Sequence, residues 1–214
     1  MSGIMLNIAG GSFGGLPAIG AAFGGGFFAG QISTAGNSIA DYNLVIGPVA
    51  STENTSIKWK NANTVTTGAD SVINGIQNTA DMVADGNATV YPAAHFCNDL
   101  VVGGFSDWYM PAENELEVCY YNLKPKVQNN DTSTGINANA VPARASNYTL
   151  STPAQTSAAD FKDTGTEDFQ TVNYWVSTET GTKYGGCKSF NTGALPIQYK
   201  TNDLSVRAIR RIAV

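Results

Sequence analysis

The chain has 214 residues, of which 43% are hydrophobic, so it can bury one real hydrophobic core. Only 14% of its residues are charged, against about a quarter in most soluble domains, and its polarity comes from Asn, Thr and Ser, which suit contacts with proteins and sugars. The net charge of −5 argues against binding to nucleic acid, because phosphate recognition needs clustered Lys and Arg.

An uncharged, glycine-rich segment opens the chain, since residues 1–40 contain no Asp, Glu, Lys or Arg. We expect neither a secretory signal, which begins with Lys or Arg, nor membrane insertion, which needs about 20 mostly large apolar residues. Residues 1–23 are predicted to be a docking or oligomerisation arm that becomes ordered against a sister subunit or another protein. Its expected assembly contacts are Ile4, Leu6, Ile8, Phe13, Leu16, Ile19 and Phe23.

Short β-rich runs bounded by Gly, Asn and Pro follow at residues 25–32 and 41–49 and predict a hairpin or a pair of strands. Residues 56–69 continue as strand and turn. Helical spacing then begins over residues 69–84, with Asp70 or Ser71 available as the cap. One face of this helix is predicted to carry Val72, Ile76, Ala80 and Val83.

Residues 91–101 repeat the helical pattern, and Pro92 suits the first turn of this second helix. Its apolar face is predicted to carry Ala93, Phe96, Cys97 and Leu100.

The segment GFSDWYMPAENELEVCYYNLKP, residues 104–125, predicts a third helix. Pro111 suits its first position, Lys124 lies at its negative end, and the final proline stops it. Its apolar stripe consists of Ala112, Leu116, Cys119, Tyr120 and Leu123.

Two acids, Glu113 and Glu115, fall in the first turn of the third helix. No base, nucleophile or metal ligand accompanies them in the local sequence. They are therefore predicted to be surface acids that match the helix dipole and not catalytic groups.

The cysteines and the histidine do not form a recognisable site. Cys97, Cys119 and Cys187 include no CxxC pair, and the single His95 cannot complete a zinc site. Buried free thiols are the expected state, with one disulfide as the alternative if the protein works outside a cell. No nucleophile–His set and no phosphate-binding loop is present. We expect no enzymatic activity, no cofactor and no metal.

Residues 127–171 lack periodicity and are rich in Asn, Thr, Ser and Gly, so they predict a long loop region packed on the domain. Tyr148, Phe161 and Phe169 are its expected anchors. Closely spaced β runs return after it and predict an antiparallel meander. These runs span residues 172–179, 187–193, 195–200 and 204–214.

Four ordered motifs, DWYMPAENELE, YWVSTE, KSFNTG and VRAIRRI, resemble the C-terminal domain of the Legionella collagen-like adhesin over roughly residues 24–214. Related domains occur in bacterial surface proteins and phage virion proteins. The resemblance implies an α+β, C-type-lectin-like fold. In this fold two or three short helices pack on a small, twisted, mostly antiparallel sheet, the first and last strands pair, and the loops are long.

The resemblance also implies a structural framework, in which the arginines of the closing strand tie loop carbonyls or carboxylates such as that of Glu115. Ala112, Val176 and Ala208 depart from the family pattern, and the last of these excludes a disulfide seen at that place in relatives. The calcium-site motifs of sugar-binding C-type lectins are absent, so calcium-dependent sugar binding does not carry over. The framework residues are Trp108, Pro111, Glu115, Leu116, Trp175, Arg207 and Arg210.

An uncharged arm followed by this domain resembles phage proteins assembled in the host cytoplasm, such as a tail-fibre tip or another exposed virion component. The first hypothesis is an adhesion module that recognises a host-surface glycan or protein. The alternative is a structural decoration, collar or baseplate subunit that contacts other virion proteins through its arm. A homo-oligomer is expected, with a trimer favoured. The candidate ligand-binding residues are Asn137, Asn139, Arg144, Asn147, Tyr148, Lys183 and Tyr184.

Overall fold

The two β runs of the N-terminal part form an antiparallel hairpin, as the sequence predicts. Strand β2 (Gly26–Ile32) pairs with β3 (Tyr42–Ile46). The structure is a computed structural model that describes residues 15–214. Four of the predicted arm contacts lie outside the described residues, namely Ile4, Leu6, Ile8 and Phe13.

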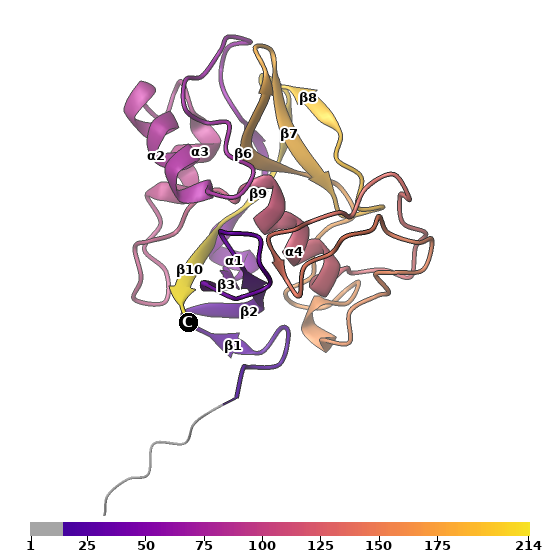
Figure 1. The fold of residues 1–214 in the computed structure, drawn as a ribbon. Coiled ribbons are helices and arrows are strands. Elements are labelled where there is room, and N and C mark those ends of the chain that lie inside the picture. The colour runs from indigo at the N-terminus through magenta and orange to yellow at the C-terminus, as the bar shows by residue number, and fades with distance from the viewer. Residues whose placement is uncertain (1–14) are drawn as a thin grey trace, which may run out of the picture.

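The strands of residues 15–214 form two sheets of five strands each, and Figure 1 shows their arrangement. The first sheet is antiparallel, in the order β1-β2-β3-β10 with β5 paired to β2, and adds β1 (Ala22–Phe23), β5 (Ala140–Val141) and β10 (Ile209–Ala213) to the hairpin. The second sheet has the order β4-β9-β6-β7-β8, with one parallel pair, β6 and β9. Its strands are β4 (Glu53–Lys58), β6 (Asn173–Gly181), β7 (Tyr184–Ser189), β8 (Ile197–Tyr199) and β9 (Asp203–Arg207).

The C-terminal segment, predicted as one strand over residues 204–214, divides at Ala208 and joins the two sheets. The Ala208 N–H donates to the Thr52 carbonyl, and the Ala208 carbonyl accepts from the Gly47 N–H, both at 3.0 Å. These bonds bend the chain, so that β9 enters the second sheet and β10 the first. The expected pairing of the first and last strands is wrong, because β10 pairs with β3.

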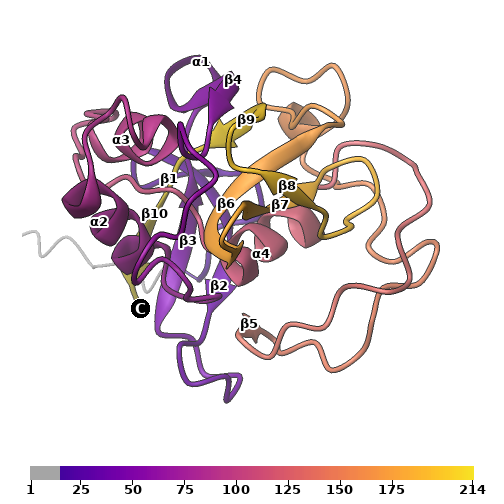
Figure 2. The ribbon, with the colours of Figure 1, turned by 90° about the horizontal axis from the view of Figure 1, so that it is seen from above.

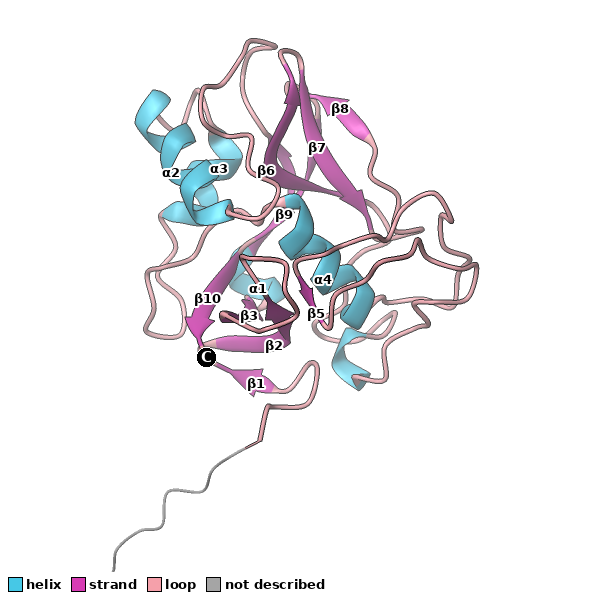
Figure 3. Ribbon diagram, in the orientation of Figure 1, coloured by secondary structure: helices cyan, strands magenta, loops and turns pink. Residues whose placement is uncertain are grey.

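Short helices cover these sheets, which confirms the predicted α+β class (Figure 3). The helix predicted from Pro92 is present and begins at that proline, whereas Pro111 lies before the N-cap of the third predicted helix and not at its first position. The helices are α1 (Val49–Thr52), α2 (Gly75–Asp85), α3 (Pro92–Asn98), α4 (Glu113–Leu123) and the 3₁₀ helix η1 (Ala159–Phe161).

The start predicted for the helix after residue 69 is wrong. Helix α2 begins at Gly75, and the Asn74 side chain caps it by accepting the Gln77 N–H at 3.2 Å. Ser71, one of the two predicted caps, instead accepts the Asn74 N–H on its hydroxyl at 3.0 Å. This bond closes a turn that precedes the helix.

The face predicted for α2 is also wrong, since Ile76 is 47% exposed and Val72, before the helix, is 43% exposed. Asn78 is fully buried in their place. Its amide donates to the Ser71 carbonyl at 2.7 Å and to the Ser177 hydroxyl at 3.1 Å. Hydrogen bonds to neighbouring segments of the same chain, and not the predicted apolar face, orient this helix.

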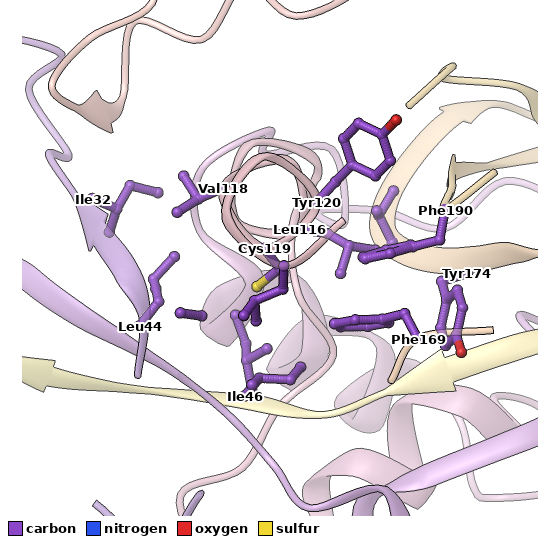
Figure 4. Close-up of a cluster of buried hydrophobic side chains, with 14 of the residues drawn as sticks. Ile32, Leu44, Ile46, Leu116, Val118, Cys119, Tyr120, Phe169, Tyr174 and Phe190 are labelled. Atoms are coloured by element: carbon purple, nitrogen blue, oxygen red, sulfur yellow. The ribbon is translucent and has the colours of Figure 1, made fainter. Parts of the chain in front are cut away.

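Helix α4 carries the predicted apolar stripe at the centre of the molecule (Figure 4). All five stripe residues are fully buried. On one side they meet the first sheet, and on the other they meet aromatic residues that include Phe169 and Phe190, whose rings stack at 3.8 Å. The labelled partners in Figure 4 are Ile32, Leu44, Ile46, Phe169, Tyr174 and Phe190.

A second core cluster forms around the tryptophans. Trp175 is fully buried and Trp108 is 2% exposed. The indole N–H of Trp175 donates to the Ile57 carbonyl at 2.8 Å, and that of Trp108 to the Val102 carbonyl at 3.3 Å. Both rings therefore have their polar atom satisfied inside the domain, as framework residues require.

Part of the predicted arm belongs to the folded body. Ile19 and Phe23 pack against the two core clusters, and the Gly20 N–H donates to the Phe28 carbonyl at 2.8 Å. Both side chains are therefore intrachain contacts here, although the sequence predicts them as assembly contacts. Of the three predicted arm contacts that the structure describes, Leu16 is the exposed one, at 58%.

The long irregular region lies along one side of the domain, next to α4 (Figure 2). Tyr148, Phe161 and Phe169 anchor it in the core, as predicted. All three cysteines are buried and unbridged, and burial raises the pKa of the Cys187 thiol to about 12. In the part of the chain that the structure describes, no helix is both long and apolar enough to cross a membrane.

Glu115 is fully buried, so the surface role predicted for it is wrong. Its Oε2 accepts the N–H of Ala112 at 2.8 Å and that of Gly75 at 3.0 Å, which satisfies free N–H groups at the starts of both α4 and α2. Its Oε1 accepts from the Tyr109 hydroxyl and from Nε of Arg211, the latter at 2.8 Å. One carboxylate thus joins two helices to the last strand.

We predict that Glu115→Gln destabilises the domain by about 3–5 kcal/mol, the usual cost of breaking a buried ion pair. The new amide also points a donor at N–H groups that need an acceptor. Urea unfolding followed by tryptophan fluorescence measures the loss. Glu113→Gln is the matched control, because Glu113 lies in the same helical turn and pairs with no cation among residues 15–214. Equal midpoints for the two variants contradict the prediction.

Candidate functional site

Three of the predicted ligand-binding residues meet at a buried carboxylate inside the domain. Glu117, on α4, accepts hydrogen bonds at 2.5 Å from the Asn137 amide and the Tyr148 hydroxyl, and it pairs with the Arg144 guanidinium. Asn137 is 1% exposed and Tyr148 5%. Burial, followed by the Glu117 charge, raises the pKa of Tyr148 far above its ordinary value. These side chains fasten the long loop to α4.

Asn139 has a similar internal role. Its amide donates to the Ser33 carbonyl at 2.8 Å and accepts from the Asn114 side chain at 2.9 Å. These contacts join the long loop to the end of β2 and the start of α4. These four polar side chains of the loop therefore bind other parts of the domain and hold the loop in place.

The other three candidates keep exposed surface and belong to two different segments of the chain. Asn147 is exposed in the long loop, beside a hollow of about 250 Å³ that also borders Arg144. Lys183 is exposed in the turn between β6 and β7. Tyr184 follows it and packs on Tyr199, with ring centroids 4.9 Å apart. The structure does not bring the seven predicted residues into one site.

The framework arginines bind carboxylates of the loops. Arg207 donates to the Glu167 carboxylate at 2.8 Å, and Arg210 makes a two-pronged contact with Asp107 at 2.7 and 2.8 Å. The expected link to Glu115 is made by Arg211, the next residue on the closing strand, and not by Arg207 or Arg210.

A groove of about 580 Å³ opens where β6 and β9 begin. These two parallel strands pair only through Tyr174 and Ser205. On the N-terminal side of that pair the two strands are not hydrogen-bonded to each other: β6 pairs there with β7, and β9 pairs with β4. We call the space between them the β6–β9 groove. Its lining is Thr55, Gln170, Thr171, Val172, Asn173, Ser189, Asn191, Asp203, Leu204 and Ser205.

The β6–β9 groove collects polar side chains that have no partner in their own chain. Within residues 15–214, six of its lining side chains neither donate nor accept an intramolecular hydrogen bond. They differ in this from Asn137 and Tyr148, whose side chains bind the Glu117 carboxylate. The six are the hydroxyls of Thr55, Thr171 and Ser189, the amides of Asn173 and Asn191, and the carboxylate of Asp203.

A buried hydrogen-bond chain runs inward from the groove rim. The Gln170 N–H donates to the Tyr174 hydroxyl, and this hydroxyl donates to Oε1 of Glu53, both at 3.0 Å. Oε2 of Glu53 is buried without a hydrogen-bond partner, and Nη1 of Arg207 lies 3.9 Å from it. Loss of hydration raises the pKa of Glu53 above its ordinary value, and the Arg207 charge opposes this rise only in part.

The groove escaped sequence analysis because four separate segments build it. Asn191 stands in the KSFNTG motif, and Asn173 opens the strand that carries Trp175. The sequence shows an asparagine at each of these places, yet only the fold shows that both amides are unpaired and border one space. Between Gly15 and Val214, no group of three or more His, Cys, Asp or Glu side chains is placed to hold a metal ion.

Short helices on two small, mostly antiparallel sheets, with a long irregular region beside them, define an α+β domain of the C-type-lectin-like class. The family model described as the Lcl C-terminal domain matches residues 49–210, and the chain belongs to this family. The match confirms the resemblance to the Legionella adhesin domain, over a narrower range than residues 24–214, and indicates an adhesin-like module. No curated protein matches the chain.

We predict that Glu53 makes the domain less stable as the pH rises above the ordinary glutamate pKa of 4.5. A pKa raised by folding means that the folded chain holds the proton more tightly. This stabilisation is complete below the unfolded pKa and is lost as the pH rises through the folded pKa. Glu53→Gln should remove the loss, so the variant gains stability relative to wild type as the pH rises above 4.5.

Urea unfolding at several pH values measures this difference. Asp70→Asn is the control, because Asp70 is exposed and its side chain has no hydrogen-bond partner among the described residues. Parallel stability curves for wild type and Glu53→Gln contradict the prediction.

Proposed function

We propose that this chain is an adhesion module that recognises a bacterial host surface through the β6–β9 groove. The observation that carries the proposal is the set of six polar side chains in the groove without intramolecular partners. A groove of about 580 Å³ lies within the size range of small-ligand sites, about 300–1,000 Å³. Membership of the Lcl C-terminal domain family supports the adhesive role.

The backbone around these side chains is already ordered. Asn173 pairs with Ser189 across β6 and β7, and Asp203 pairs with Lys58 across β9 and β4. Ordering a flexible side chain on binding costs about 0.5–1.5 kcal/mol. Groups held on paired strands lower that cost, because the chain that carries them does not rearrange.

We further propose that the module is an exposed component of a phage virion, such as a tail fibre, assembled in the host cytoplasm as a homotrimer. Two features support this context. The domain resembles those of phage virion proteins, and the uncharged, glycine-rich start of the chain, residues 1–14, suits docking into an assembly. The context is tested below through the arm.

Binding and not catalysis is the role we propose for the groove. The single histidine does not line it: His95 lies on α3, and its Nε2 is 2.8 Å from the Gly86 carbonyl. The cysteines are buried and their thiol pKa values are raised by loss of hydration, so they are poor nucleophiles.

We predict that Asn173→Ala combined with Asn191→Ala weakens attachment of the full-length chain to host cells about ten-fold or more. Each lost hydrogen bond contributes about 0.5–1.5 kcal/mol, and 1.4 kcal/mol is a ten-fold change in affinity. Flow cytometry with labelled protein measures the change. Both side chains are free of internal bonds, so the fold should be unaffected.

Two controls separate the groove from other surfaces. Ser56→Ala alters the residue next to Thr55 on β4 that does not line the groove, and Asn147→Ala alters the exposed loop candidate. Both should bind as wild type does. The groove is not the recognition site if the Asn173→Ala, Asn191→Ala variant attaches as well as wild type, or if attachment is lost only with Asn147→Ala.

A second candidate function is structural, as a decoration, collar or baseplate subunit that docks through its N-terminal arm. Leu16 favours it, because this large apolar side chain is 58% exposed where the arm meets the body. The structure also sets the point of truncation. Ile19 and Phe23 pack on the core, so a cut at residue 23 removes core contacts.

We predict that a chain beginning at Gly15 keeps the thermal stability of the full chain but is not incorporated into particles. Immunoblotting of purified virions, with soluble protein levels as the control, measures incorporation. Full incorporation of the truncated chain rejects docking through residues 1–14, and leaves the groove proposal standing.

A further inference from the structure

We infer that the β6–β9 groove takes a neutral, hydroxyl-rich saccharide and discriminates against anionic sugars. The inference rests on the proposed function, since it names the ligand class of the same groove. Four features of the groove carry it, namely the donor and acceptor types, the single charge, the apolar contacts and the pairing of the strands.

The free groups of the groove match sugar hydroxyls in kind. The hydroxyls of Thr55, Thr171 and Ser189 each donate and accept, and so do the amides of Asn173 and Asn191. A sugar hydroxyl also donates and accepts. A lining of this mixed type can satisfy several neighbouring hydroxyls without leaving a buried donor or acceptor unpaired, which would cost about 1–3 kcal/mol each.

The charge of the groove selects against anions. Among residues 15–214, Asp203 is the only charged side chain that lines it, and no Lys or Arg does. Lys58 lies opposite Asp203 in the β4–β9 pairing but forms no ion pair with it among the described residues. A carboxylate accepts strong hydrogen bonds from hydroxyls and repels a uronate, sialate, sulfate or phosphate.

Apolar contact is available but limited. Val172, which is 46% exposed, and Leu204 lie among the polar groups. They can contact the C–H faces of a pyranose ring. No aromatic side chain from the described part of the chain, Gly15 to Val214, lines the groove, so hydrogen bonds and not ring stacking should determine which sugar binds.

The strand pairing disfavours an extended peptide as the ligand. A peptide that adds a strand needs a free sheet edge. In the second sheet β9 lies between β4 and β6, and β6 lies between β9 and β7, so their facing edges are free only over the one or two residues before the Tyr174–Ser205 pair, too few for a peptide strand to pair with. The groove therefore presents mainly side chains.

The test compares matched oligosaccharides with the full-length chain. The probes are neutral hexose and N-acetylhexosamine oligosaccharides and the same oligosaccharides carrying a uronic acid or a sulfate, immobilised as an array. We expect neutral probes to bind at least about ten-fold better than their acidic counterparts, a difference of about 1.4 kcal/mol. Raising the salt concentration should narrow the gap, because it screens the repulsion.

Two variants assign the selectivity to Asp203. Asp203→Asn removes the charge with little change of shape, and should weaken neutral binding about ten-fold while reducing the preference over acidic probes. Ser56→Ala, outside the groove, should leave both unchanged. Equal or better binding of acidic probes by the wild type, or no effect of Asp203→Asn, overturns the inference.

Treatment of the host cells separates this inference from the proposed function. Periodate cleaves vicinal diols of surface glycans, whereas protease removes surface proteins. Attachment that is lost after periodate and retained after protease supports a saccharide. The opposite pattern, with attachment still sensitive to Asn173→Ala and Asn191→Ala, overturns the saccharide and keeps the groove. Attachment insensitive to those substitutions rejects the proposed function itself.

Discussion

The carboxylate of Glu115 holds the helical part of the domain to its last strand, and much of the structure depends on it. One oxygen satisfies N–H groups at the starts of α2 and α4, and the other binds Tyr109 and Arg211. The position of α2, with its exposed apolar residues, follows from this contact and from the buried amide of Asn78. The apolar stripe of α4 holds that helix in the core between the first sheet and the aromatic cluster, while Glu115 fixes the residue at which the helix begins.

Although only 14% of the residues are charged, many of the charged side chains are buried. Buried charged side chains include Glu117, Lys124, Lys188 and Arg207, each bonded to a loop or a strand end. Such bonds do not add much net stability, because desolvation offsets the attraction. They do fix long irregular segments that contain little regular structure. The surface that remains is rich in neutral amides and hydroxyls, and five such groups line the β6–β9 groove without an intramolecular partner among residues 15–214.

Local patterns in the sequence predicted the hairpin and the stripe of α4, since apolar spacing and turn residues act over a few residues, and the family resemblance predicted the tryptophan framework. They could not predict the groove or the role of the loop. An asparagine such as Asn137 looks the same in sequence whether it binds Glu117 or a ligand. Which of the two it does depends on whether a distant partner lies within hydrogen-bond reach. Asn173 and Asn191 stayed free because β6 and β9 separate beside them.

The closing segment links the β6–β9 groove to the sheet beside the N-terminal arm, an arrangement that suits the proposed adhesive role. Asp203 and Ser205 on β9 line the groove, and Ala208 leads directly into β10. Strand β10 pairs with β3, β3 with β2, and β2 with β1, next to the arm. If the proposed role holds, a pull between a ligand in the groove and a particle at the arm passes along these paired strands. The bonds of Arg210 and Arg211 to Asp107 and Glu115 brace the same segment from the side, so the residues that hold the fold together also oppose its opening under load.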